Sequence, residues 1–274
     1  MNTANSPIIY HQYSPGQWRT IQAEVIVEAP VSLTVNGDLW LTFMCTPVQL
    51  EAMAVGFLFN EGLIDSVEEI ADVRLCATGD NVDVWTYLPL EKPQQWQRTS
   101  GCTGGMTSVL KHPRSKRIPN GGALPAQRIG ELIAQLFESQ ELYKSSGGVH
   151  TSALSDGKRI VITAEDIGRH NTLDKLAGHI LMEKIHLPRK IILSTGRISS
   201  EMLQKSSRMG VSIVISRTSP SSLSIELAEI LGITLIGYAR RNQFNVYAHP
   251  GRILLPSSTH QATKDEFNQS EKAT

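Results

Sequence analysis

Residues 190–216, with the sequence KIILSTGRISSEMLQKSSRMGVSIVIS, contain two short apolar runs on either side of an amphipathic stretch. The runs predict strands over 190–195 and 211–216, of the kind that is buried on both faces of a parallel sheet. The stretch between them has helical spacing and stops at Gly210, since glycine commonly ends helices. This order predicts two neighbouring parallel strands joined by a right-handed crossover.

The same alternation continues on both sides of this unit. It predicts further strands and helices, over 159–165, 166–184, 217–232 and 233–239. Ser219 is expected to cap the helix over 217–232, with Pro220 in its first turn and Gly232 at its end. The sequence therefore predicts an α/β domain over 124–255, with a parallel-rich sheet and helices on both faces.

The N-terminal part, 21–123, is rich in β-branched residues and predicts a smaller, β-rich region. One hairpin is expected over 21–45, turning at 36–38, and a second over 72–88, turning at 79–81. Helices are expected over 46–64, capped by Thr46, and over 125–143. Residues 1–20 are expected to form a loose lead and residues 256–274 a disordered tail.

The composition limits the classes of function. The chain has 274 residues, with 26 basic and 26 acidic side chains, so its neutral balance argues against broad nucleic-acid or membrane-surface binding. Its N-terminus shows no signal peptide, and its apolar runs are too short to span a bilayer. Three scattered cysteines, Cys45, Cys76 and Cys102, suit a reducing compartment, so we expect a cytoplasmic protein.

Three segments that follow predicted strands share one composition. They are Glu165–Asn171, Ser194–Ser200 and Ser216–Pro220, and each contains an arginine, hydroxyl or amide side chains and the start of a helix. Helix N-termini and arginine forks both suit phosphate, although single loops of this kind are commonly ordinary helix caps. In series they predict a site for a large phosphorylated ligand, with the candidate residues Arg169, His170, Ser194, Thr195, Gly196, Arg197, Ser216, Arg217 and Ser219.

One cysteine stands apart from the apolar segments, in RTSGCTGGMTS at 98–108. Cys102 has glycines on both sides, so it is either a tolerated loop residue or a thiol presented to a reaction partner. The thiolate is the reactive form, and Arg98, Lys111 and Arg114 are candidate charges that would lower its pKa. Cys45 and Cys76 lie in predicted strands and are interpreted as structural.

The histidines and acidic residues admit two interpretations. His150 and His170 lie in polar or glycine-rich turns and would hold or relay a proton, or simply make structural hydrogen bonds. Asp166 is a candidate helix cap, and Glu165 a candidate partner for Arg169. The sequence has no paired cysteine motif and no deaminase signature, so we expect no metal site.

Several long segments together resemble the formate dehydrogenase accessory sulfurtransferase family, FdhD. They are GGVHTSAL (147–154), EDIGRHNTLDKLAGHIL (165–181), the segment 194–240 and FNVYAHPGRI (244–253), joined by TPVQLEAMAVGFLFNEGLI (46–64) and RTSGCTGG (98–105). The resemblance runs from about Glu24 to Leu255. It implies a cytidine-deaminase-like fold without the deaminase zinc site.

The resemblance also implies a role as a sulfur carrier. Members take persulfide sulfur from a cysteine desulfurase and pass it to bis-molybdopterin guanine dinucleotide, the molybdenum cofactor, before its insertion into the formate dehydrogenase catalytic subunit. The sulfur-carrying cysteine matches Cys102. The stretch that contacts the cofactor matches Phe244, Asn245, Val246, Tyr247, Ala248 and His249. A homodimer is also plausible from this resemblance.

One departure from the family pattern keeps alternatives open. Many members carry Cys-x-x-Cys where this chain has Cys102-Thr103-Gly104-Gly105. The change weakens a two-cysteine shuttle and leaves carriage by a single cysteine. A second hypothesis is a non-catalytic chaperone that binds the cofactor, and a third is a cysteine hydrolase with a histidine base.

Overall fold

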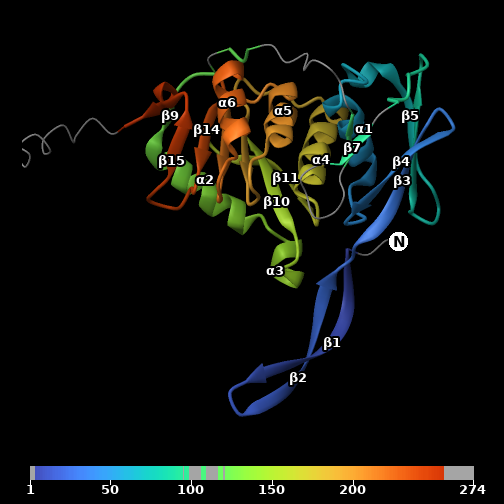
Figure 1. The fold of residues 1–274 in the computed structure, drawn as a ribbon, viewed down its shortest axis with the longest axis horizontal. Helices are drawn as coiled ribbons and strands as arrows, with labels where there is room; N and C mark the ends of the chain where they lie inside the picture. Colours follow the sequence, from blue (N-terminus) through green and yellow to red (C-terminus); the bar gives the residue numbers. More distant parts are fainter. Residues whose placement is uncertain (1–3, 95, 99–105, 109–116, 120, 256–274) are drawn as a thin grey trace, which may run out of the picture.

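The computed structural model describes residues 4–94, 96–98, 106–108, 117–119 and 121–255. The main body is a succession of layers (Figure 1). A six-stranded sheet is covered by helices on both faces, and a smaller four-stranded sheet lies beyond the helices of one face. The α/β class and the β-rich N-terminal part are confirmed. No helix in these residues is long and apolar enough to cross a membrane.

The six-stranded sheet has the order β11-β10-β12-β13-β14-β15. Strands β12, β13 and β14 are parallel neighbours, whereas β10 is antiparallel to both β11 and β12, and β15 is antiparallel to β14. The sheet is therefore mixed, with its parallel strands at the centre. Its strands are β10 (His150–Ser155), β11 (Ile160–Asp166), β12 (Ile191–Ser194), β13 (Ile213–Ser216), β14 (Thr234–Gly237) and β15 (Asn245–Ala248).

Two hydrophobic clusters cover the faces of this sheet. Helix α2 supplies one cluster, with side chains such as Leu132 and Leu136 packed on Leu193 and Ile215. Three helices pack on the opposite face, where Leu176 and Leu203 meet Val214. The helices are α2 (Ala126–Glu138), α4 (Arg169–Met182), α5 (Ser200–Arg208) and α6 (Ser222–Leu231).

The N-terminal sheet has the order β4-β3-β6-β5 and packs against helix α1. Its strands are β3 (Ala29–Val35), β4 (Asp38–Cys45), β5 (Ile70–Leu75) and β6 (Asn81–Thr86), and α1 is Leu50–Asn60. The β3–β4 turn at Asn36 and Gly37 has positive φ at both residues, as the asparagine–glycine pair predicts. Both expected hairpins are therefore present, but the first begins at Ala29 and not at residue 21, because residues 17–26 pair with residues 5–14 instead.

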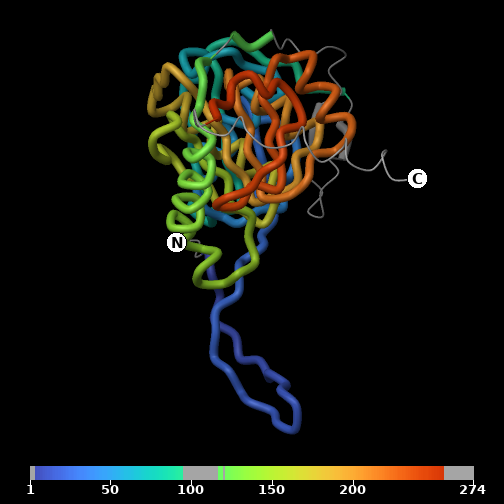
Figure 2. The backbone as a smooth tube through the Cα atoms, turned by 90° about the vertical axis from the view of Figure 1, so that its left-hand side faces the viewer, coloured from blue at the N-terminus to red at the C-terminus, as the bar shows by residue number. Residues whose placement is uncertain are grey.

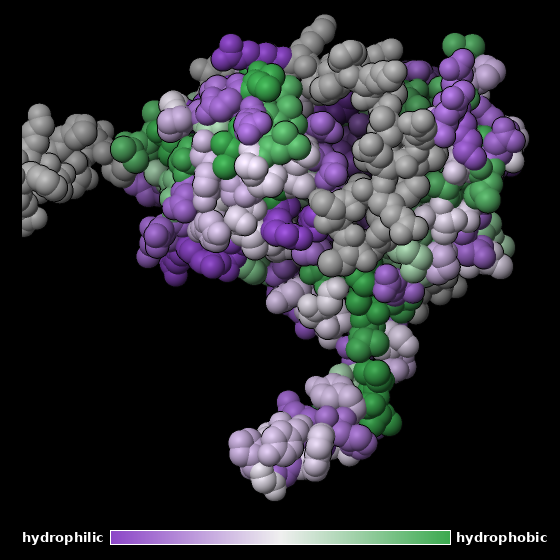
Figure 3. All heavy atoms as spheres, viewed as in Figure 1, coloured by the Kyte–Doolittle hydropathy of each residue, from purple (hydrophilic) through white to green (hydrophobic). Residues whose placement is uncertain are grey.

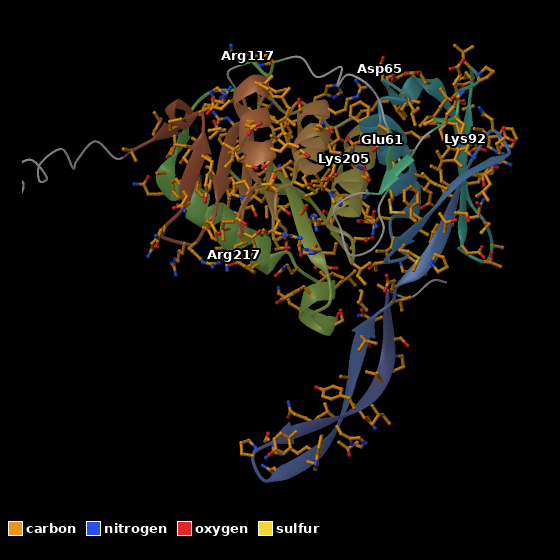
Figure 4. All side chains as sticks on the ribbon, viewed as in Figure 1. Glu61, Asp65, Lys92, Arg117, Lys205 and Arg217 are labelled. Atoms are coloured by element: carbon orange, nitrogen blue, oxygen red, sulfur yellow. The ribbon has the colours of Figure 1, made fainter. Side chains whose placement is uncertain are left out.

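Helices α1 and α4 join the two parts of the body at an unusually close crossing. A Cβ on Gly178 would lie 1.8 Å from the Ala52 carbonyl oxygen, and one on Gly56 would lie 1.8 Å from the Asp174 carbonyl oxygen. Only glycine permits this backbone contact. Beside it, the buried Lys205 ammonium lies 2.7 Å from both Asp174 carboxylate oxygens and 3.7 Å from a Glu61 oxygen (Figure 4).

Residues 5–26 differ from the expected loose lead. They form β1 (Asn5–Ser14) and β2 (Gln17–Ile26), an antiparallel hairpin that projects from the body as an arm (Figure 2). Hydrophobic residues gather in the half of the arm nearest the body, whereas the tip is weakly hydrophilic (Figure 3). At its root, Asn5 Nδ2 donates to Ser145 Oγ at 2.8 Å, and Ile26 contacts Gly148. The arm is thus anchored close to His150.

Short elements complete the chain. β7 (Trp96–Arg98) pairs with β8 (Met106–Ser108), β9 (Leu124–Pro125) pairs with β16 (Ile253–Leu254), and α3 covers Leu142–Ser146. The single helix expected over 125–143 is therefore divided into α2 and α3. Two 3₁₀ turns cover Val67–Glu69 and Pro250–Arg252. The predicted tail, 256–274, lies outside the described residues.

Candidate functional site

The three predicted loops lie at one edge of the six-stranded sheet. β11, β12 and β13 run in the same direction, because β10 is antiparallel to both β11 and β12. β10 therefore starts at the edge where these strands end, and His150 lies opposite Asp166 in the ladder. This carboxyl edge is where open α/β sheets commonly bind ligands. We call it the carboxyl edge below.

The hydroxyl groups of these loops hold the loops to one another. Ser194 Oγ accepts the Gly196 N–H at 3.1 Å, Thr195 Oγ1 accepts the Thr151 N–H at 3.0 Å, and Ser216 Oγ donates to the Gly196 carbonyl at 2.7 Å. Ser194 and Ser216 are fully buried. Their side chains thus have local partners, and the structure gives them a role in shaping the edge.

The predicted cap of α6 is wrong. The cap is Ser221, whose Oγ accepts the Ser224 N–H at 3.3 Å, whereas the Ser219 carbonyl accepts the Ile198 N–H. Pro220 forms an isolated bridge with Ile198 instead of starting the helix. The loop therefore stays extended for two more residues and is tied to the β12–α5 loop.

A buried ion pair connects the start of α4 to the N-terminal sheet. Lys175 Nζ donates to Asp166 Oδ2 at 2.7 Å, to the Glu165 carbonyl at 3.0 Å and to the Thr46 carbonyl at 3.1 Å, so its three protons all have acceptors. Asp166 also accepts the N–H groups of Thr46 and Gly168. Thr46 was predicted to cap α1, but its hydroxyl accepts the Ile167 N–H instead.

Burial makes the neighbouring thiol unreactive. Cys45 is fully buried, and desolvation, reinforced by the Asp166 carboxylate, raises its pKa to about 12. A thiol in this state is a poor nucleophile, because the thiolate is the reactive form. The interpretation of Cys45 as structural therefore agrees with its surroundings.

Glu165 caps a helix at the same edge. Its carboxylate accepts the N–H groups of Glu141, Leu142 and Tyr143 at 2.7–3.1 Å, which lie at the start of α3. The carboxylate also accepts the Thr151 hydroxyl at 3.2 Å. The structure thus gives Glu165 a capping role that the suggested pairing with Arg169 did not anticipate. This cap also explains why the helix predicted over 125–143 is interrupted.

His150 lies among cations. The Gly196 backbone approaches it closely, since a Cβ there would lie 3.4 Å from His150 Nδ1 and 3.2 Å from the Arg169 side chain. Burial lowers the pKa of His150, and Arg169 and Arg197 lower it further against an opposing effect of Asp166. The imidazole is therefore neutral at pH 7. Arg197 is exposed and forms no ion pair within the described part of the chain.

His170 connects two helices. Its Nε2 lies 3.3 Å from Ser199 Oγ and 3.4 Å from Glu201 Oε2, and Ser199 caps α5. Burial lowers the pKa of His170, although the Glu201 hydrogen bond opposes the shift. Its side chain is only 5% exposed. These contacts favour the structural interpretation of His170 over proton relay.

The stretch Phe244–His249 does not lie wholly at the carboxyl edge. Asn245 is opposite Gly237 there, but β15 then runs away from it, and Ala248 is buried opposite Leu235. His249 Nε2 lies 3.1 Å from the Glu229 carbonyl oxygen of α6, at the far end of the strand. Successive strand residues also point to opposite faces. Only the start of this stretch therefore lies at the carboxyl edge.

Two further arginines follow β14 and were not anticipated. Arg240 and Arg241 are exposed in the connection to β15, at the same edge. Their signal in the sequence was a pair of arginines directly after an apolar strand. Cys102 lies outside the described residues, between β7 and β8 in the sequence. Within the described residues, no group of three His, Cys, Asp or Glu side chains is arranged to hold a metal.

Comparison with known proteins places this fold in a family. The model of the FdhD/NarQ family matches residues 26–254. The chain belongs to the FdhD/NarQ family. A relative from Bacillus pumilus, named sulfur carrier protein FdhD, is 35% identical over 255 residues, which cover 89% of this chain and 96% of the relative. A protein of the same name from Bacillus subtilis is 34% identical over 252 residues, covering 88% and 95%.

A solved structure has the same fold as this chain. The crystal structure of a formate dehydrogenase accessory protein from Desulfotalea psychrophila superposes with a TM-score of 0.79 at 30% sequence identity. The match covers 92% of this chain and 100% of that one. The resemblance expected from the motifs is thereby confirmed for almost the whole chain.

Proposed function

We propose that this chain is a sulfur carrier in the maturation of formate dehydrogenase. It receives persulfide sulfur from a cysteine desulfurase on Cys102 and passes it to bis-molybdopterin guanine dinucleotide, the cargo. The observation that carries the proposal is the similarity of almost the full chain to proteins named sulfur carrier protein FdhD. The loaded cargo would then be received by the catalytic subunit of the dehydrogenase.

The loading step needs one cysteine of this chain. The Cys102 thiolate attacks the outer sulfur of the desulfurase persulfide, a new S–S bond forms, and the desulfurase cysteine leaves as a thiolate. Cys102 then carries the sulfur as a persulfide, with no net oxidation and no external reductant. Gly105, in place of a second cysteine, does not block this step, because no resolving thiol takes part.

The charge of the carboxyl edge supports the cargo assignment. Arg169 and Arg197 lie beside a neutral His150, and the Gly196 backbone lies against the side chains of both Arg169 and His150. Arginine and helix N-termini together suit the diphosphate groups of a guanine dinucleotide. The residues proposed to bind the cargo are therefore those at the beginning of the three loops that follow β11, β12 and β13, together with Phe244 and Asn245.

The glycine at position 105 favours a second candidate function. A chain that lacks the Cys-x-x-Cys pair could hold the cofactor without carrying sulfur, as a chaperone. The two functions differ in what they require of Cys102. The chaperone needs no thiol, whereas the carrier fails without it.

Complementation separates these functions. A host that lacks this protein would receive the wild type, Cys102→Ala or, as a matched control, Cys76→Ala, and formate dehydrogenase activity would be measured. The carrier predicts that Cys102→Ala restores almost no activity but still binds GDP, while Cys76→Ala restores activity as the wild type does. Full activity with Cys102→Ala would contradict sulfur carriage and establish the chaperone.

A further inference from the structure

The neutral charge of the whole chain conceals a strongly acidic N-terminal part. Residues 27–94, which contain α1 and the four-stranded sheet, carry eleven acidic side chains and only two basic ones, Arg74 and Lys92. The remainder of the chain has the opposite excess, because acidic and basic residues are equal in number overall. A part of the molecule with such an excess of one sign attracts partners of the opposite sign.

Large apolar and aromatic side chains are exposed together at one end of the four-stranded sheet. They are Leu39, Trp85, Tyr87 and Leu88, whose exposed fractions range from 42% to 76%. The β3–β4 turn lies beside Trp85, since a Cβ on Gly37 would be 3.9 Å from the indole ring, and Leu39 follows that turn by two residues. Exposed groups of this kind are typical of surfaces that contact another protein.

Acidic residues surround these apolar side chains. Trp85 Nε1 donates to Asp83 Oδ2 at 2.7 Å, and Asp72 lies opposite Trp85 in the β5–β6 ladder. The Tyr87 N–H donates to the Glu69 carbonyl at 3.0 Å. Of the acidic residues here, Asp72 pairs with Arg74, and the others form no ion pair with the described residues. We call the four apolar residues and their acidic neighbours the acidic face; the acidic residues are Asp38, Glu69, Asp72, Asp83 and Glu91.

The acidic face is remote from the carboxyl edge. Strand β4 begins at Asp38 on this face and runs for eight residues, ending next to Thr46, whose N–H donates to Asp166 at the carboxyl edge. A strand of this length spans about 25 Å. Lys92, beside the acidic face, and Arg217, at the carboxyl edge, accordingly lie far apart on the body (Figure 4).

The acidic face is instead close to the β7–β8 hairpin. Lys92 Nζ donates to the Leu39 carbonyl at 2.7 Å, which holds the segment before β7 against this face. Trp96, the first residue of β7, follows Lys92 by four residues, so the two Cα atoms lie within about 14 Å of each other. In the sequence, β7 and β8 flank the segment that contains Cys102.

We propose that the acidic face is the docking surface for the sulfur donor, a cysteine desulfurase that presents lysine and arginine side chains around an apolar contact. The inference rests on the proposed function, in which Cys102 receives persulfide sulfur from such a protein. Negative charge excludes the cargo from this face, because it repels phosphate groups. Basic side chains of the donor would pair with the carboxylates, and an arginine would stack on the exposed ring of Trp85.

The position of the face favours the donor over the dehydrogenase as the partner. The donor has to reach the segment between β7 and β8, which follows the acidic face in the chain. The dehydrogenase has to receive the cargo, which is proposed to bind at the remote carboxyl edge. One partner on each side would allow both to act on the same molecule.

Binding of the purified cysteine desulfurase of the same organism tests the charged part of the face. Biolayer interferometry would compare the wild type with Asp38→Lys/Glu91→Lys. The matched control is Glu138→Lys/Glu226→Lys, which makes the same change of net charge at exposed positions that form no ion pair with the described residues. We expect Kd to rise about tenfold or more in the face variant at low salt, to rise less at high salt, and to stay within about twofold in the control.

A second pair of variants tests the apolar part. Leu88→Ser should raise Kd about threefold or more at both salt concentrations, whereas Leu223→Ser, which is also exposed but lies on α6, should leave it unchanged. Sulfur loading would be measured with limiting desulfurase and cysteine, and separately with glutathione persulfide, a small donor that needs no docking. Both face variants should load more slowly than the wild type from the desulfurase and at about the wild-type rate from glutathione persulfide, which would also show that they are folded.

The outcomes distinguish this proposal from the proposed function. If the face variants bind the desulfurase as tightly as the wild type, or the controls weaken binding equally, the acidic face is wrong while sulfur carriage stands. A wild type that binds no desulfurase would overturn the face as well. If the wild type accepts sulfur from neither donor, the proposed function is overturned, and the affinities still decide the docking surface.

Discussion

The carboxyl edge carries two groups of charged residues, a buried inner group and an exposed outer group. The inner charges are paired with one another, whereas the outer charges are not paired. In the inner group, Asp166 and Lys175 are both fully buried and lie 2.7 Å apart. The remaining Lys175 protons are donated to the Thr46 and Glu165 carbonyl oxygens. Outside, Arg197, Arg240 and Arg241 are exposed and form no ion pair with the described residues.

The difference indicates two separate tasks. The inner pair joins the N-terminal sheet to α4, because Thr46 shares both of its charged groups. A ligand cannot reach it. The outer arginines are exposed and have N–H donors that a ligand could use, as expected of a binding surface. Substitution of the inner pair should therefore act on folding, and substitution of the outer cations on binding.

Lys175→Met should have the largest effect on stability. The substitution leaves the Asp166 carboxylate buried without its cation, which costs about 3–5 kcal/mol of the free energy of unfolding. Denaturant titration would measure it, with the exposed Lys158→Met as a control that should change stability by less than about 0.5 kcal/mol. Equal unfolding midpoints for the two variants would show that the inner pair does not join the two parts.

Gly178→Ala should lower stability by about 1–3 kcal/mol, since the new methyl group meets the backbone of Ala52 at the α1–α4 crossing. This loss occurs although alanine is otherwise the better helix former. Gly251→Ala is the matched control, because a Cβ at Gly251 has no neighbour within 4 Å. A Gly178→Ala protein that is as stable as the control would refute the close crossing.

Acid should weaken the fold through the two histidines of the edge. Burial lowers the pKa of both His150 and His170, so the unfolded chain takes up protons below about pH 6.5 that the folded chain does not. Their contribution to stability is complete above this pH and is lost as the pH falls, by up to about 1.4 kcal/mol per pH unit for each. His170→Gln should reduce the slope of unfolding free energy between pH 7 and 5, relative to the exposed His186→Gln. An unchanged slope would contradict the buried, neutral state of His170.

Arg197→Gln should have the smallest effect on stability, within about 0.5 kcal/mol, because the side chain is exposed and unpaired in the described structure. Its effect should appear instead as weaker GDP binding and a shallower dependence of affinity on salt. Calorimetry at two salt concentrations would measure this. If Arg197→Gln lowered stability but left the GDP affinity unchanged, the claim that the exposed cations serve binding and not folding would be contradicted.

The regular elements could be predicted because their patterns are local. The apolar runs at 191–194 and 213–216 and the helix between them follow from spacing alone. The strand β10 was missed, since HTSALS is small and polar at several positions and follows two glycines. Its insertion between β11 and β12 depends on pairing with distant residues, which no local pattern encodes.

The candidate site was predictable in position but only partly in detail. The order of strands and loops placed Arg169, Arg197 and Arg217 at one edge. Composition cannot tell whether a hydroxyl meets a ligand or a neighbouring loop, so the local bonds of Ser194 and Ser216 were not foreseen. Residues 244–249 lie only partly at this edge, because β15 alternates its sides and runs away from it.

The most direct test of sulfur carriage is the intact mass of the protein after incubation with a cysteine desulfurase and cysteine. The wild type, Cys102→Ala and Cys76→Ala would be compared with and without reductant. We predict a gain of one sulfur in the wild type and in Cys76→Ala that reductant removes, and no gain in Cys102→Ala. A wild type that gains no sulfur, or a Cys102→Ala protein that gains as much, would contradict Cys102 as the carrier.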